Sequence, residues 1–475
     1  MSDVLIVGAG SAGSVLAERL SADPSCRVTL VESGPAPTDP RVHTQISDGL
    51  RLPIGPASSV VRRYPTTLTV DPERHGQIMR GAVVGGSGAV NGGYFCRGLP
   101  SDFAAWNLPG WSWADVLPHF KALETDLDFR TDVHGTDGPI TVQRVREFDG
   151  CTALFVAAAT RAGHPWIADL NGSTPEAPVG AGVGPVPLNI HRGTRVGPGG
   201  AVLQPALERP NLTLLAGTRA VAVRIRDGRA VGVTCTGPAG RTDLDADRVV
   251  LCAGAVGSAH LLMLSGVGPA GVLRAAGIPV VADLPVGAAF ADHPEWVVPV
   301  HWAETHGVPP LEAVLTTDDG LEIRSYTAGF GAMVTGRRND PGDHPHIGVT
   351  LMRPRSRGRV TVVSDDPDRL PHIEHRYDTE LADVDLLREG VEMVREIVGG
   401  TTELGPVSWS TSQHLSRTAP MGADDDPDAV VDPRCRVRGI DRLWVADGSV
   451  LPAITSRGPH ATICMIGHRV AEFIG

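Results

Sequence analysis

The amino-acid sequence predicts an α/β protein in which a discontinuous Rossmann-like domain is interrupted by an α+β domain that contains an antiparallel sheet. Three observations predict this fold class. Residues 4–34 carry an apolar run, a glycine-rich turn, a helix pattern and a second apolar run that ends in an acid, which is the order of a βαβ unit. Short alternating segments replace that pattern between residues 290 and 430, as expected for antiparallel strands. A strand, a turn and a helix return over 443–474.

The turn of the first unit has the spacing of a dinucleotide-binding site. Gly8, Gly10 and Gly13 form G-x-G-x-x-G. The first glycine allows the tight turn, the second lets a pyrophosphate approach the backbone, and the third lets the helix pack on the strand. Glu32 ends the second strand, where a carboxylate can accept both ribose hydroxyls. The alternative is a plain tight turn, and the motif does not distinguish FAD from NAD.

Composition excludes several classes of protein. A net charge of −12 argues against a nucleic-acid surface. Lys121 is the only lysine, which excludes a P-loop. The seven cysteines form no C-x-x-C pair, so we expect reduced thiols, no disulfide framework and no metal site. No apolar run is long enough to cross a bilayer, and the first strand begins at once, so we expect a cytoplasmic protein without an integral membrane segment.

The remaining elements follow in order along the chain. Residues 35–80 show little periodicity, and we expect an irregular segment that acts as a lid or wraps a cofactor. Asn211–Val233 contains strands separated by the turn at Asp227 and Gly228, and Arg248–Gly254 is a buried strand that leads into a helix.

The middle of the chain predicts the second domain. Strands are expected at 296–302, 347–353, 359–363 and 372–377, and Glu380–Val398 has apolar residues at helical spacing. We therefore predict a cofactor-binding domain made of residues 1–140, 195–290 and 430–475, and a substrate-binding domain made of residues 141–194 and 291–429.

The chain resembles the glucose-methanol-choline (GMC) family of FAD-dependent oxidoreductases. The segments that carry the resemblance follow the family's order from one end of the chain to the other: Arg80–Gly98, Gly254–Pro269, Pro285–Pro294, Arg353–Val363, His414–Gly422 and Arg442–Gly467. Gly88 stands where the family usually has a serine.

The resemblance implies FAD as the cofactor. It assigns to FAD the following residues: Gly8, Gly10, Ser11, Ala12, Gly13, Glu32, Ser33, Arg80, Gly85, Gly86, Asn91, Gly92, Ala220, Val221, Ala253, Asp447, Gly448, Pro459, His460 and Ala461. Some members attach FAD through a histidine at the position of Val90, so the resemblance implies non-covalent FAD here.

The resemblance also implies the reaction, which is oxidation of an alcohol to an aldehyde or ketone. His414 is the expected general base, because a histidine can take the hydroxyl proton while flavin N5 accepts hydride. The family's second catalytic histidine or asparagine falls at Gly458, which has no side chain, and His460 is the candidate replacement.

The resemblance leaves the electron acceptor and the subgroup open. We expect a small-molecule alcohol substrate and a non-oxygen acceptor such as a quinone, a redox cofactor or a respiratory component. The alternatives are an alcohol oxidase that releases hydrogen peroxide, a lyase that uses the same fold, and a non-catalytic flavin-binding protein. The tail S-R-G-P-H-A-T is similar to that of actinobacterial dehydrogenases linked to the redox cofactor mycofactocin.

Overall fold

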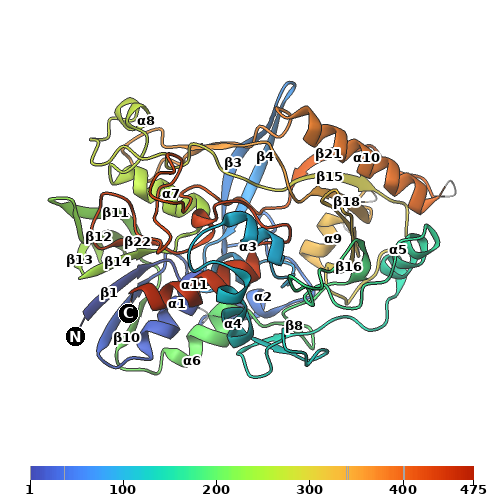
Figure 1. Ribbon diagram of the computed structural model, residues 1–475, viewed down its shortest axis with the longest axis horizontal. Coiled ribbons are helices and arrows are strands. Elements are labelled where there is room, and N and C mark those ends of the chain that lie inside the picture. Colours follow the sequence, from blue (N-terminus) through green and yellow to red (C-terminus); the bar gives the residue numbers. More distant parts are fainter. Residues whose placement is uncertain (1, 37, 338–339, 341, 400–401, 475) are drawn as a thin grey trace.

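A parallel sheet and an antiparallel sheet lie at opposite ends of an elongated molecule, and both chain termini lie near the parallel sheet (Figure 1). The computed structural model describes residues 2–36, 38–337, 340, 342–399 and 402–474. Within these residues no helix has the length and hydropathy needed to span a membrane. The cytoplasmic location stays a prediction.

The parallel sheet has the strand order β10-β2-β1-β14-β22. Its strands are β1 (Ser2–Val7), β2 (Cys26–Val31), β10 (Leu212–Leu215), β14 (Arg248–Leu251) and β22 (Leu443–Val445). In the central register Ile6 lies beside Leu30 on one side and Val250 on the other, and all three are buried. Because every pair is parallel, the carboxyl ends of these strands meet at one edge of the sheet.

Two helices pack together beside this sheet. They are α1 (Ser11–Ser21) and α11 (His460–Ile474), and Figure 1 shows them side by side. A Cβ atom at Gly467 would lie 2.4 Å from the carbonyl oxygen of Ala12. Only a glycine therefore permits this close approach, which packs the middle of α11 against the first turn of α1.

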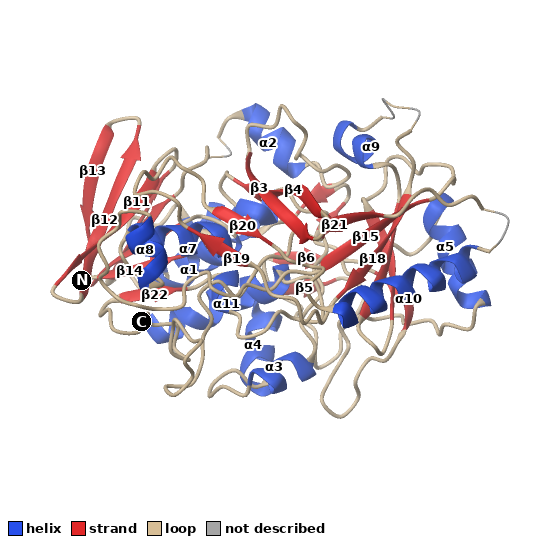
Figure 2. Ribbon diagram, turned by 90° about the horizontal axis from the view of Figure 1, so that it is seen from above, coloured by secondary structure: helices blue, strands red, loops and turns tan. Residues whose placement is uncertain are grey.

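The antiparallel sheet has the order β21-β15-β18-β17-β16-β7. Its strands are β7 (Gly182–Pro185), β15 (Pro294–Pro299), β16 (Leu311–Thr316), β17 (Leu321–Tyr326), β18 (His346–Leu351) and β21 (Ser408–Thr411). Helices α5 (Gly150–Arg161) and α10 (Leu381–Val398) lie at this end (Figure 2) and share a hydrophobic cluster with Ile323 and Val349. Glu322 and Arg324 alternate with Ile323, so their side chains point to the opposite face.

The predicted strands near 296, 347, 359 and 372 are confirmed as β15, β18, β19 (Arg359–Thr361) and β20 (His372–Glu374), and the predicted helix as α10. The turn at Asp227 and Gly228 is also confirmed, because both residues have positive φ between β11 (Arg219–Arg226) and β12 (Arg229–Gly237).

The prediction of an irregular segment over residues 35–80 was wrong. The segment contains α2 (Pro40–Ser47) and a long hairpin of β3 (Val61–Val70) and β4 (Glu73–Gly81). The hairpin was missed because polar residues occupy inward positions: Arg62 and Tyr64 line the cavity described below. Strand alternation is therefore absent from the hydropathy pattern.

Shorter elements complete the chain. The remaining helices are α3 (Pro100–Trp106), α4 (Trp113–Leu123), α6 (Gln204–Ala206), α7 (Gly254–Leu264), α8 (Ala270–Ala275) and α9 (Phe330–Thr335), and the remaining strands are β5 (Glu124–Asp126), β6 (Ile140–Val142), β8 (Ile190–His191), β9 (Thr194–Arg195) and β13 (Gly240–Asp245). Strands β19 and β20 join the β3–β4 hairpin in one sheet. That sheet combines segments from both proposed domains, and the domain boundaries stay a prediction.

Candidate active site

The carboxyl ends of β1, β2, β14 and β22 open into a cavity of about 1430 Å³, part of which is open to solvent. Ligands of open parallel sheets bind at this edge. Most of the predicted cofactor residues line it: Gly8, Gly10, Ser11, Ala12, Glu32, Ser33, Arg80, Gly86, Ala220, Ala253, Asp447, Gly448 and Pro459. His414 lines the same cavity. The structure thus brings the predicted base and these predicted cofactor residues together.

The space around each glycine of the turn shows whether packing within the protein requires a glycine there or a bound ligand does. A Cβ atom at Gly8 would lie 2.4 Å from the carbonyl oxygen of Cys252, and one at Gly13 would lie 1.9 Å from that of Gly8. At Gly10 a Cβ atom would meet nothing closer than 3.8 Å, and φ is −77°. The protein itself therefore does not require glycine at position 10, whereas a pyrophosphate against the backbone does.

Glu32 is buried at the end of β2 and keeps both carboxylate oxygens in place. Oε2 accepts the N–H of Ala9 (2.9 Å) and Oε1 accepts the N–H of Gly34 (2.7 Å). Burial raises the pKa of this carboxyl despite these bonds. Oε1 also accepts the hydroxyl of Ser33 (3.2 Å), so Oε2 is the oxygen that retains a further lone pair for a ribose hydroxyl.

Asp447 ties the end of β22 to the start of α7. Its Oδ2 accepts the N–H of Gly254 (2.8 Å) and the hydroxyl of Ser258 (2.6 Å). Burial raises the pKa of Asp447. This contact fixes two of the cavity walls relative to each other.

The hydrogen-bond partners of His293 and His414 determine which ring nitrogens of these two histidines carry protons. Nε2 of His293 lies 3.1 Å from the carbonyl oxygen of Thr455, which can only accept, so Nε2 carries a proton. Burial lowers the pKa of His293 to about 4, so its Nδ1 is an acceptor at neutral pH. Nδ1 of His414 lies 2.9 Å from that atom and must donate to it. The lone pair of His414 is therefore on Nε2.

The pKa of His414 lies well below its ordinary value, because burial and the nearby His293 and Arg324 disfavour the cation. Asp292 holds this pair in position: its Oδ1 accepts the backbone N–H groups of His293 and His414, both at 2.8 Å. Burial alone would raise the pKa of Asp292, but hydrogen bonding to His375 (3.0 Å) holds it below its usual range. His414 is therefore a neutral imidazole with a fixed orientation.

His460 lies on a different side of the site. Its Nδ1 accepts from the amide of Asn91 (3.0 Å), and its ring packs edge-on against Phe95. Burial lowers its pKa to about 4. A Cβ atom at Gly88 would lie 2.7 Å from its Nε2, so a serine at position 88 would collide with the ring. These contacts bring His460 to the glycine-rich segment and give no contact with His414.

Several predicted residues support the cavity without lining it among the described residues: Gly13, Gly85, Asn91, Gly92, Val221, His460 and Ala461. Gly85, for example, has φ +99° and shapes the turn that presents Gly86. Sequence reasoning missed Arg62 and Tyr64 on β3 and His260 on α7, which do line the cavity.

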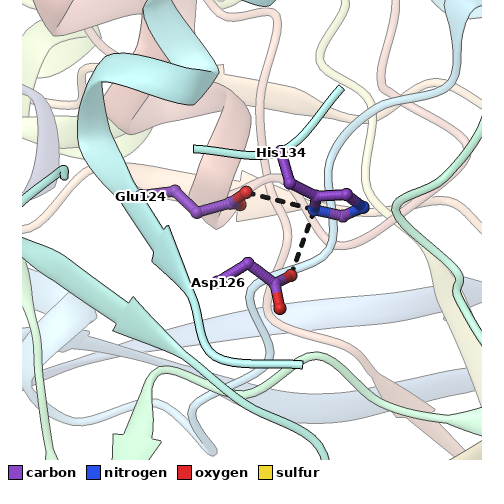
Figure 3. A group of neighbouring side chains, drawn as sticks. All are labelled: Glu124, Asp126 and His134. Carbon is purple, nitrogen blue, oxygen red and sulfur yellow. Dashed lines mark hydrogen bonds and ion pairs between the residues drawn. The ribbon is translucent and has the colours of Figure 1, made fainter. Parts of the chain in front are cut away.

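A second group of titratable side chains lies within the fold. Nδ1 of His134 lies 3.1 Å from Asp126 and 3.3 Å from Glu124 (Figure 3), and its Nε2 lies 2.8 Å from Asp169. Sequence reasoning missed this cluster because its members come from separate loops and strands.

The cluster has the geometry of an ion network rather than of a metal centre. Both ring nitrogens of His134 face carboxylates and therefore carry protons, which leaves neither lone pair for a metal. Burial opposes the charge, but the three carboxylates raise the pKa of His134 to about 10. Arg97 pairs with Glu124, and Arg144 pairs with Asp126 and Asp169. Asp128 extends the network, because it pairs with Arg144 (3.7 Å) and with the exposed Arg146 (3.1 Å), so four cations balance four carboxylates.

Comparison with known proteins supports the assignment drawn from the cavity. Family models described as GMC oxidoreductase match residues 2–295 and 354–467. The chain is 41% identical over 497 aligned residues to a GMC-type oxidoreductase from the thcA 5′ region of Rhodococcus erythropolis, covering 100% of this chain and 98% of the relative. It is 33% identical over 542 residues to the oxygen-dependent choline dehydrogenase of Brucella canis, covering 100% and 95%.

Solved structures agree with the fold. Pyridoxine 4-oxidase from Mesorbium loti superposes with a TM-score of 0.87 at 28% identity, covering 99% of both chains. A fungal aryl-alcohol oxidase superposes with a TM-score of 0.81 at 21% identity, covering 100% of this chain and 98% of that one, which shows the shared fold. The glycine cradle and Glu32 fit FAD, the cofactor of this class. The chain therefore belongs to the GMC oxidoreductase family and is an FAD-dependent oxidoreductase of alcohol-type substrates.

Proposed function

We propose that the protein oxidises an uncharged alcohol to an aldehyde or ketone, with His414 as the general base. The observation that carries the proposal is the hydrogen bond between His414 and His293, because it leaves the lone pair of His414 on Nε2. His414 takes the hydroxyl proton at that atom, and Nδ1 continues to donate to His293. When bound, FAD supplies the two-electron acceptor that takes a hydride from the alcohol carbon.

Charges around His414 support an uncharged substrate. Glu322 accepts from Arg324 Nε (2.7 Å), and Glu295 accepts from Arg324 Nη1 (3.0 Å). Both carboxylates are therefore already paired with a guanidinium. Arg324 and Arg80 also act on His414 as nearby cations, and the Asp292 carboxylate, which acts in the opposite direction, is hydrogen-bonded to His375 and Thr411. A quaternary ammonium alcohol such as choline, named for some relatives, would face cations at this site and is not the expected substrate.

The proposed electron acceptor is a quinone, a redox cofactor such as mycofactocin, or a respiratory component. The support is that burial keeps the histidines of this site neutral: the pKa values of His293 and His460 are lowered to about 4. Reduction of oxygen builds up negative charge, which a protonated histidine would stabilise. Gly458 contributes no side chain for this purpose.

The test of the base is anaerobic stopped-flow reduction of the holoenzyme by a panel of alcohols. His414→Ala should retain FAD and slow flavin reduction by about 10²–10⁴-fold, because a positioned base is lost. His372→Ala is the matched control, since His372 is exposed on β20. A loss smaller than about threefold would contradict the role of His414. Wild-type enzyme that no alcohol reduces would instead favour the lyase or non-catalytic alternatives.

The test of the acceptor mixes reduced holoenzyme with air-saturated buffer or with a quinone. We expect reoxidation by the quinone to be faster than turnover and reoxidation by oxygen to be slower than turnover. Reoxidation by oxygen that outpaces turnover, together with release of hydrogen peroxide, would make the protein an oxidase.

A further inference from the structure

Gly458 stands at the position of the family's second catalytic side chain. The space that a side chain would take there is occupied by the ring of Tyr94. A Cβ atom at Gly458 would lie 2.9 Å from Cδ1 and Cε1 of Tyr94, and 3.4 Å from Cε1 of His414. Gly458 is not among the glycines with positive φ, so its backbone accepts any residue. The ring of Tyr94, and not the backbone, is therefore what restricts position 458 to glycine.

The ring of Tyr94 is held at both ends. Its hydroxyl donates to Oε2 of Glu322 (2.8 Å), and Glu322 is fully buried on β17 and paired with Arg324. On the backbone side, the N–H of Phe95 donates to the carbonyl of Pro187 (2.8 Å). Turning the ring away would leave a buried carboxylate oxygen without its donor, which is costly.

Part of the Tyr94 side chain remains exposed although Phe95 and Glu322 beside it are buried. The ring of Tyr94 lies against the Cβ position of Gly458, and Cε1 of His414 also comes within contact distance of that position. Because Cε1 of His414 is bonded to Nε2, an alcohol whose hydroxyl reaches Nε2 comes near this ring.

We infer that Tyr94 is a specificity-determining residue, which takes the space left by Gly458 and restricts the substrate beside His414 to unbranched alcohols. The inference rests on the proposed function. It requires that Tyr94 and Gly458 act as a pair: a side chain at position 458 fits only when the ring at position 94 is absent. Tyr94 does not take part in proton transfer and acts by shape.

The experiment uses four holoenzymes: wild type, Gly458→Ala, Tyr94→Val and the double variant. Two properties are measured, namely the thermal midpoint and the ratio of kcat/KM for linear alcohols to that for their branched isomers, such as n-pentanol against neopentyl alcohol. Gly458→Ala should lower the thermal midpoint in the wild-type background but not in the Tyr94→Val background, because contacting residues are coupled. Tyr94→Val should shift the selectivity ratio toward the branched isomer by about tenfold or more.

Two further variants separate shape from hydrogen bonding. Tyr94→Phe keeps the ring and should keep the selectivity ratio, even if its rate falls. Tyr326→Phe removes a comparable hydrogen bond to a buried carboxylate, since its hydroxyl lies 3.2 Å from Glu295, and should also leave the ratio unchanged.

Each outcome decides the inference. An unchanged selectivity ratio in Tyr94→Val, or equal effects of Gly458→Ala in both backgrounds, would overturn it while leaving the proposed function in place. Wild-type holoenzyme that no alcohol in the panel reduces would overturn the proposed function, and this inference with it.

Discussion

Single residues in the glycine turn have separate physical roles that the motif does not distinguish. Gly8 has φ +104° and Gly13 packs against the carbonyl of Gly8, so both are required by the fold. Gly10 has ordinary backbone angles and open space around its Cβ position. Only the ligand therefore requires glycine at position 10.

Gly10→Val should consequently fold and yet lose FAD. We expect a purified protein with a thermal unfolding transition but little flavin absorbance, because the side chain enters the space of the pyrophosphate. Gly271→Val is the control, since Gly271 is exposed on α8 with no atom within 4 Å of its Cβ position. Acid precipitation of the wild type should leave its flavin in the supernatant, because Val90 offers no group for attachment. A yellow Gly10→Val protein would contradict the assignment.

At the scale of elements, two antiparallel neighbouring strands position His414, the proposed base. Strand β15 follows Asp292 and His293, and its partner β21 precedes His414. Asp292 accepts backbone N–H groups from both segments and the Thr411 hydroxyl (2.7 Å). The strand pairing therefore sets the distance between the two histidines, and we propose that His293 is a positioning residue.

Variants of His293 test this arrangement. His293→Phe removes the acceptor for Nδ1 of His414 and should slow flavin reduction by about 10²-fold with FAD content unchanged. His293→Asn keeps an acceptor near the Nδ1 position and should recover part of that rate. For the wild type, the lowered pKa of His414 predicts a reduction rate that is constant above pH 6.5 and falls at more acid pH, as the base becomes protonated. Equal rates in the Phe variant and the wild type would exclude the positioning role.

At the scale of the whole molecule, the ion network around His134 joins distant segments. Arg97 ends the glycine-rich segment and pairs with Glu124, while its backbone N–H donates to Asn171 (2.9 Å). Asp169 and Arg144 belong to the same network. The network lies between the largest hydrophobic cluster, which includes Val142, and a smaller one that includes Leu170 and Cys96. It therefore connects the C-terminal end of the glycine-rich segment to residues 124–169.

This network predicts how stability depends on pH. The pKa of His134 in the folded protein is about 10, above its ordinary value of 6.5, so its contribution is complete below pH 6.5 and is lost as the pH rises through 10. His134→Gln should cost about 3–5 kcal/mol of unfolding free energy at neutral pH, because buried carboxylates lose their cation.

The measurement is denaturant unfolding between pH 6 and pH 10. Wild type should lose stability steadily over that range, and His134→Gln should lose much less of it. His75→Gln serves as the control, because His75 pairs with Glu73 on an exposed hairpin. A pH dependence that is the same in all three proteins would show that His134 is not the titrating group.

The sequence by itself determined the features that depend on local order. The Rossmann-like unit is predicted by the glycine spacing, by the acid after β2 and by the apolar runs of β1 and β14. The second domain is predicted by short alternating segments and by the helical period of α10. Periodicity and turn chemistry are local properties of the chain, so the sequence alone shows them. The segment around His414 was likewise enough to predict this histidine as the base, because the residues that carry the resemblance lie together in one stretch of the chain.

The tertiary structure decided what depends on contacts between distant segments. The partner of His414 is 121 residues away, and the group that fills the space over Gly458 comes from position 94. The network of His134 contains residues between 97 and 169. The strands of the β3–β4 hairpin are not recognisable from hydropathy, because inward side chains such as Arg62 and Tyr64 face the cavity. Proton positions, charge pairing and cavity shape arise only when such segments meet, so no local pattern in the sequence could have specified them.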